Sequence, residues 1–153
     1  VAGNILSGNI KNFSHKGFIQ FKRLETKAKE YVRLFNIKTP TIKHLVYALS
    51  GGNQQKVLLA MWLVKNPQIV IVDEPTRGID VGTKEEIHRL LRDLARQGLG
   101  ILMISSDMPE LLAASDRILV MYEGRLTGEI PHADATEQSV MHYASGNAAD
   151  EER

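Results

Sequence analysis

The sequence predicts an α/β fold built on a parallel sheet, and three stretches of the chain support this. Residues 69–72, Ile-Val-Ile-Val, form a run of β-branched residues that is typical of a strand buried on both faces of a parallel sheet. Residues 87–94 place apolar side chains on one helical stripe, and residues 101–104 form a second apolar run. Strand, helix and strand in alternation indicate an open sheet, in which ligands bind beyond the carboxyl ends of the strands.

The other elements follow from helical spacing, turn residues and stop signals. Apolar residues at three- and four-residue spacing predict an amphipathic helix over 18–35, and Pro40 breaks that pattern. A second helix is expected over 50–66. The segment Thr83-Lys84-Glu85-Glu86 is typical of a capping box, and Gly98 ends the helix that follows it. The later predicted elements are a helix over 109–114, a strand over 118–122, a turn at Glu123-Gly124, a strand over 126–130 and a helix over 136–144.

Composition narrows the class of protein. The 153 residues include no cysteine, which excludes disulfides and thiolate metal sites, and the longest apolar run is too short to cross a bilayer. No signal-peptide pattern opens the chain, so we expect a cytosolic protein. Residues 1–48 carry nine basic and two acidic side chains, which indicates either a solvated helix face or a docking face for a partner or a membrane surface. We expect ordinary surface roles for the five histidines, because none is spaced for a metal site: His15, His44, His88, His132 and His142.

Two adjacent carboxylates, Asp73 and Glu74, end the first predicted strand. In nucleotide hydrolases the first acid of such a pair holds Mg²⁺, usually through water, and the second orients or deprotonates the attacking water. Acids at this position also serve simply as caps of the next turn, and the pair alone leaves both interpretations open. The longer string IVIVDEPTRGID, with a further acid at Asp80 after a glycine, favours the catalytic interpretation.

Two glycines at the start of a helix are a second unusual feature. A glycine within a helix costs about 1 kcal/mol relative to alanine, so a compensating role is expected for Gly51 and Gly52. Ser50 is a suitable N-cap, whose hydroxyl can accept from a first-turn amide. Backbone amides without neighbouring Cβ atoms, at the positive end of a helix dipole, can approach an anion closely. The stretch predicts a phosphate-facing helix tip, although a flexible loop-to-helix junction is the alternative.

The combination of these motifs resembles one family. LSGGNQQK, residues 49–56, resembles the signature motif of ABC-transporter ATPases; IVIVDEPT, residues 69–76, resembles their Walker B strand with the catalytic glutamate; GID, residues 78–80, resembles their D-loop. The two segments LSGGNQQKV and DEPTRGIDVG are together similar to the second nucleotide-binding half of the tandem ATPase subunits of bacterial sugar importers, of the ribose, galactose and xylose type. SSDMPELLAASDRILVMYEGRLTGE, residues 105–129, and the front segment extend the resemblance over nearly the whole chain.

This resemblance implies a partial P-loop NTPase domain of the RecA-like type. Residues 1–66 would form the ABC helical subdomain with the signature helix, and residues 67–153 the C-terminal half of the parallel sheet core. A Walker A loop requires Gly, four residues, Gly-Lys and Ser or Thr, and no such string occurs in the sequence. We therefore expect a fragment that, by itself, binds ATP weakly or not at all and is inactive as an enzyme.

The resemblance also implies a role for each motif residue. Asp73 would hold Mg²⁺ through water, and Glu74 would be the catalytic glutamate. Ser106 stands where the family usually carries a histidine that contacts the γ-phosphate, and its hydroxyl cannot carry the positive charge of an imidazolium. We expect hydrolysis at this half's own site to be impaired. The D-loop would comprise Gly78, Ile79 and Asp80. The signature residues that would act on an ATP held by the partner half are Leu49, Ser50, Gly51, Gly52, Asn53 and Gln54.

The implied function is that of the ATP-binding and hydrolysing subunit that energises sugar import, with ATP and Mg²⁺ as cofactors. Its partners would be the first nucleotide-binding half of the same subunit or a second ATPase copy, a transmembrane permease and, indirectly, a periplasmic sugar-binding protein. The expected location is peripheral, at the cytoplasmic face of the bacterial inner membrane.

Two alternatives remain at this point. A non-transport ABC ATPase of the DNA-repair or chromosome-organising type usually carries long coiled coils, which this sequence lacks. The net charge of +1 also does not indicate a nucleic-acid-binding surface. A non-hydrolysing half that only completes its partner's site differs from the main interpretation only in whether Glu74 turns over ATP.

Overall fold

The computed structural model describes residues 1–15 and 18–146, and the chain divides into two compact units, Val1–Ile104 and Ser105–Arg153. Each unit is described by itself below. This division falls at a different place from the predicted boundary between residues 66 and 67, which concerns subdomains of an ABC ATPase and stays a prediction.

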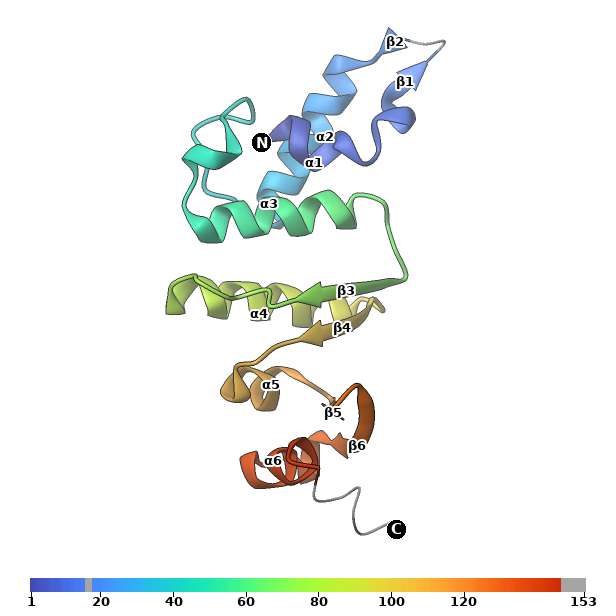
Figure 1. Ribbon diagram of the computed structural model, residues 1–153. Coiled ribbons are helices and arrows are strands. Elements are labelled where there is room, and N and C mark those ends of the chain that lie inside the picture. Colours follow the sequence, from blue (N-terminus) through green and yellow to red (C-terminus); the bar gives the residue numbers. More distant parts are fainter. Residues whose placement is uncertain (16–17, 147–153) are drawn as a thin grey trace. The chain divides into compact units, whose positions relative to one another are not determined.

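The first unit combines helices with a short parallel sheet (Figure 1). Its elements, in chain order, are α1 (Ala2–Ser7), the 3-10 turn η1 (Ile10–Phe13), β1 (Ser14–His15), β2 (Phe18–Ile19), α2 (Phe21–Leu34), the 3-10 turn η2 (Val46–Ala48), α3 (Gly51–Leu63), β3 (Ile69–Asp73), α4 (Val81–Arg96) and β4 (Gly100–Ile104).

The front of the chain is less helical than its spacing predicts. The expected helix over 18–35 begins only at Phe21, because Phe18 and Ile19 pair with β1 as an antiparallel strand. The Gln20 amide donates to the Phe13 carbonyl at 2.8 Å, which holds this short hairpin against the start of α2. Phe21 itself is 69% exposed and takes no part in the apolar stripe.

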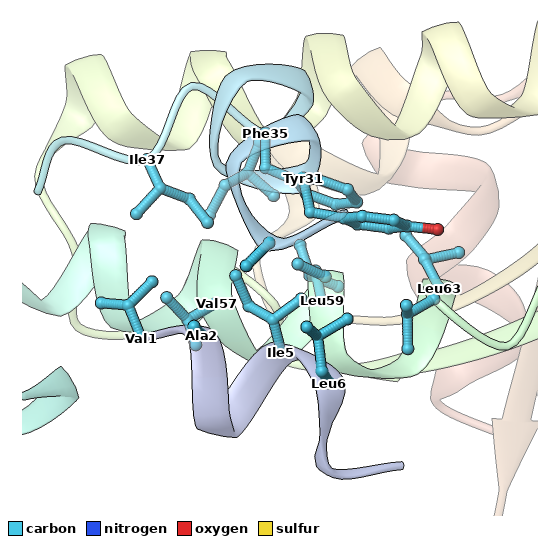
Figure 2. Packing of buried hydrophobic residues seen from close by; sticks show 14 of the residues in the cluster. Val1, Ala2, Ile5, Leu6, Tyr31, Phe35, Ile37, Val57, Leu59 and Leu63 are labelled. Atoms are coloured by element: carbon cyan, nitrogen blue, oxygen red, sulfur yellow. The ribbon is translucent and has the colours of Figure 1, made fainter. Parts of the chain in front are cut away.

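Three helices of the first unit meet in one apolar core. Figure 2 shows side chains of α1, α2 and α3 pointing toward one another, with Ile5 and Leu6 of α1 near Leu59 of α3. Tyr31 and Phe35, one helical turn apart, stack with ring centroids 5.9 Å apart and close the core from the α2 side. This packing fixes the direction of α3, the helix whose first residues carry the signature motif.

β3 and β4 form a parallel pair, as the alternation of elements predicts, with Ile69 opposite Gly100 and Asp73 opposite Ile104. The prediction that β3 is buried on both faces is wrong for the described residues. Val70 and Val72 are buried on the core side, whereas Ile69 and Ile71 are 69% and 66% exposed. The described residues therefore cover one face of this sheet, and a continuous apolar run alone does not indicate whether a second layer is present.

The second unit is an antiparallel hairpin covered by helices. Val140 of α6 packs on Ile118, Val120 and Ile130 of the hairpin. Glu123 and Gly124 both have positive φ, 46° and 76°, which is the geometry of a tight hairpin turn and confirms the predicted turn. Its elements are α5 (Met108–Ala114), β5 (Arg117–Tyr122), β6 (Arg125–Pro131), the 3-10 turn η3 (His132–Asp134) and α6 (Glu137–Ala144). In the described parts of both units, no helix combines the length and apolar character needed to span a bilayer.

Candidate functional site

The tip of α3 leaves its amides open. Ser50 occupies the N-cap position, as predicted, but its side chain accepts no hydrogen bond from a backbone N–H of the first turn, so the expected capping bond is wrong. The amides at the first helical positions have no acceptor within their own helix. Ser50 and Gly51 are exposed. The tip thus presents backbone N–H groups, the positive end of the helix dipole and a hydroxyl to the surroundings.

The Asn53 side chain is hydrogen-bonded to Ser50. The Asn53 Nδ2 donates to Ser50 Oγ at 2.8 Å, and the Asn53 Oδ1 accepts from the Lys38 backbone N–H at 2.7 Å. A backbone N–H only donates, so the amide can have only this orientation, and Ser50 Oγ must be an acceptor in this pair. The Ser50 hydroxyl hydrogen therefore points away from Asn53. Gln54, the next residue, anchors the preceding loop by donating to the Leu49 carbonyl at 2.8 Å.

The two glycines have different surroundings. A Cβ at Gly52 would lie 2.1 Å from Cγ2 of Thr83, so only glycine lets α3 approach α4 this closely. A Cβ at Gly51 would meet Ile79 Cγ2 at 3.8 Å, which is ordinary contact. Gly52 is buried in this contact. Helix packing therefore explains why position 52 requires glycine. Packing does not explain the glycine at position 51, which lies on the exposed face of the tip.

The acid of the predicted D-loop caps α4. Asp80 is the N-cap residue: its Oδ1 accepts from the Thr83 amide at 2.9 Å and its Oδ2 from the Thr83 hydroxyl at 2.7 Å. These hydrogen bonds lower the pKa of Asp80. The predicted capping box at Thr83–Glu86 is wrong, because α4 already begins at Val81 and its cap lies three residues before Thr83. Gly78, with φ of 74°, makes the turn before Ile79, whose Cγ2 lies near Gly51 of the α3 tip.

Asp73 and Glu74 end β3 in the predicted place. Glu74 has φ of 46°, a left-handed conformation that costs a non-glycine residue energy and that is frequent at functional sites. Its N–H donates to the Ile104 carbonyl at 2.8 Å, and its carbonyl accepts from the Arg77 amide at 3.2 Å. Thr76, two residues on, is buried. The backbone around Glu74 is thus held by hydrogen bonds through both its N–H and its carbonyl.

The donor set at this strand end fits Mg²⁺. Among the described residues no group of three histidine, aspartate, glutamate or cysteine side chains is placed to hold a metal by itself. Mg²⁺ commonly takes only one or two protein carboxylates, and fills its remaining positions with water and substrate phosphates. Asp73, exposed at the end of β3, is suited to that role. The metal would supply charge neutralisation on the phosphates.

Ser106 belongs to the second unit and precedes α5 in the connection from β4. It is exposed, and the neighbouring Asp107 caps α5 by accepting from the Glu110 amide at 3.2 Å. The predicted surface positions of the histidines hold where they are described: His132 and His142 are exposed, and His44 and His88 are partly exposed. The side chain of His15 lies outside the described residues.

The motifs did not indicate an ion pair between a buried lysine and a partly exposed glutamate. Lys56, within the signature segment, is 3% exposed and forms a hydrogen-bonded ion pair with Glu86 of α4. Its Nζ also donates to the Asn36 carbonyl at 3.1 Å. One sequence signal was present, since a lysine interrupts the apolar stripe of α3 at a core-facing position.

The ion pair gives a prediction about acid stability. Hydrogen bonding and charge attraction from Lys56 lower the pKa of Glu86. A lowered pKa in the folded state stabilises the fold above the unfolded pKa of about 4.3, and that contribution disappears as the pH falls through the folded value. Glu86→Gln should therefore flatten the acid limb of a plot of unfolding free energy against pH. Urea unfolding followed by Trp62 fluorescence at pH 3 to 7 tests this; parallel acid limbs for the two proteins would contradict it.

Comparison with solved structures identifies the class. The fold resembles an inward-facing metal-chelate-type ABC transporter, with a TM-score of 0.79 and 18% identity over 94% of this chain and 57% of that one. It also resembles a dimeric bacterial ABC transporter cassette, with a TM-score of 0.69 and 26% identity over 84% of this chain and 54% of that one. The structure therefore has the α/β fold of part of an ATP-binding cassette, as its motifs predict.

Sequence comparison specifies the family. Residues 5–77 match the ABC transporter family model. A ribose/galactose/methyl galactoside import ATP-binding protein of Rhizobium etli is 51% identical over 146 residues, which cover 95% of this chain. The chain spans about 28% of the length of the curated relatives it matches. The match over residues 5–77 and the identity to this relative agree with the resemblance that the signature and Walker B motifs predict.

Proposed function

We propose that this chain is part of the ATP-binding and ATP-hydrolysing component that energises sugar import through an ABC transporter. The single observation that carries the proposal is the α3 tip without a side-chain cap, with Ser50 and Gly51 exposed and Thr83 packed against Gly52. Open amides at a helix start are suited to a polyphosphate. The name of the Rhizobium etli relative supports a sugar of the ribose or galactose type.

The two motif clusters would serve different nucleotides. Asp73 and Glu74 would act on an ATP held by a Walker A loop associated with this same core, and no such loop occurs within the chain. Ser50, Gly51 and the other signature residues would act on an ATP held by the partner half. The dimeric cassette among the similar structures supports such a pairing. The partner would be another nucleotide-binding half of the same subunit or a second copy.

We further propose that the two ATP sites are unequal. Ser106 offers a neutral hydroxyl where a histidine would offer a cation to the γ-phosphate, so hydrolysis on this half's own ATP would be slow. The half would then contribute mainly through its signature tip. A transmembrane permease and a periplasmic sugar-binding protein complete the proposed assembly, at the cytoplasmic face of the inner membrane.

The test is ATP-driven uptake of radiolabelled ribose or galactose into vesicles that contain the full-length protein, its permease and its binding protein. We expect uptake that requires ATP. Glu74→Gln removes the carboxylate and should lower the initial rate by less than about tenfold, because this site contributes little turnover. Glu85→Gln, an exposed acid on α4, is the control. Absence of ATP-driven uptake of either sugar would contradict the import function; a loss from Glu74→Gln larger than that from Ser50→Arg would contradict the inequality.

A further inference from the structure

Lys56 has no part in the function proposed above, although it is the only charged side chain of α3 and is buried. It is 3% exposed, and its ammonium group is paired with Glu86 and hydrogen-bonded to the Asn36 carbonyl. A buried ammonium is unfavourable unless it is both paired and hydrogen-bonded, and an apolar residue of similar volume would often be as stable. Stability alone therefore gives a weak reason for a lysine at this position.

The position of Lys56 suggests a geometric reason. It lies one helical turn after Gly52, and Glu86 lies three residues after Thr83. α3 and α4 consequently touch at two points: Gly52 against Thr83 at the helix starts, and Lys56 with Glu86 one turn further in. Two contacts along the same pair of helices oppose both sliding and rotation, since either movement breaks at least one of them.

The first contact connects directly to both functional segments. Gly52 belongs to the α3 tip, and Thr83 is held by two hydrogen bonds to Asp80. Any change in the angle between α3 and α4 would therefore displace Asp80 relative to Ser50. Asn36, which has φ of 47° and follows α2, adds a third element to the same lysine.

We propose that Lys56 is a positioning residue that holds the α3 tip and the Asp80 segment in a fixed register. The functional consequence rests on the proposed function, in which the tip serves the partner's nucleotide. A movement of the tip would then be transmitted to the segment that follows Asp73 and Glu74. The register itself is a property of the two helices and can be measured without nucleotide.

The test is hydrogen exchange of the full-length protein with Lys56→Met, with Lys65→Met, an exposed lysine just beyond α3, as the control. Amides of Gln54, Thr83 and Lys84, which bond to Ser50 or Asp80, should exchange about tenfold faster in Lys56→Met. Amides of Ile5 and Val140 should be unchanged, and Lys65→Met should leave all five unchanged. Equal acceleration of all five amides would overturn the proposal, because it is expected if Lys56 only stabilises the fold as a whole. Unchanged exchange at all five would also overturn it, because it is expected if Lys56 contributes nothing.

A milder variant covers the case in which Lys56→Met does not fold. Glu86→Gln keeps an acceptor oxygen beside Lys56 and should accelerate the same three amides about threefold. In the uptake assay, Lys56→Met should lower the maximal rate about tenfold and change the KM for ATP by less than about threefold, since the lysine is buried and not among the exposed groups of the tip. If Ser50→Arg has no effect on uptake while the exchange pattern appears, the proposed function fails and the fixed register stands.

Discussion

Ser50→Arg is expected to abolish ATP-driven uptake, with a fall in the initial rate of about a hundredfold or more. The exposed hydroxyl is replaced by a long cation at the helix tip, which removes one donor and fills the space that an incoming phosphate would occupy. The measurement is the vesicle uptake assay, with ATP hydrolysis recorded in parallel.

Ser50→Thr is the matched control for this prediction, because it keeps a hydroxyl that can accept from Asn53 and still donate outward. We expect it to retain uptake within about threefold of the unaltered protein. Since Ser50 is exposed, neither variant should lower thermal stability appreciably. Uptake that survives Ser50→Arg would remove the assignment of the α3 tip to a nucleotide.

Gly52→Ala is expected to destabilise the fold by about 1–3 kcal/mol, although alanine is the better helix former. The new Cβ would lie 2.1 Å from Thr83 Cγ2, and the Thr83 rotamer is held by its hydrogen bond to Asp80. The helices must therefore separate. Urea unfolding of the variant measures the loss of free energy.

Gly51→Ala is the comparison for this second prediction, because its Cβ meets only Ile79 at 3.8 Å, and its unfolding free energy should stay within about 0.5 kcal/mol. Thr83→Ser, which removes Cγ2 and keeps the hydroxyl on Asp80, should recover part of the loss from Gly52→Ala. Equal effects of Gly51→Ala and Gly52→Ala would show that the close approach of α3 to α4 does not matter.

The secondary structure was largely predictable where the pattern was strong. The strands at 69–72 and 101–104, the turn at Glu123-Gly124 and the helix beginning after Thr136 are all confirmed, because β-branched runs, left-handed turn residues and side-chain caps act locally. The start of α4 was predicted too late, since Asp80 and Thr83 are both good caps and only the geometry of the preceding turn decides between them.

The site was predictable as a set of motifs and unpredictable as a set of contacts. The sequence indicates that Asp73, Glu74 and the Ser50–Gly52 segment carry the chemistry, and those roles stay predictions. It could not indicate that Gly52 faces Thr83 or that Lys56 reaches Glu86, because each contact joins residues about thirty positions apart whose approach depends on the core beneath them.

The hydrogen bond from Asn53 limits which side chains can stand at position 50. That side chain must accept a hydrogen bond from the Asn53 amide and still have a donor that points outward. A serine or threonine hydroxyl does both with a single oxygen atom, whereas alanine does neither, a carboxylate only accepts and an ammonium group only donates. Asn53 thus limits the residue types that are tolerated at position 50, independently of any nucleotide. Replacing Asn53 should allow more residue types there.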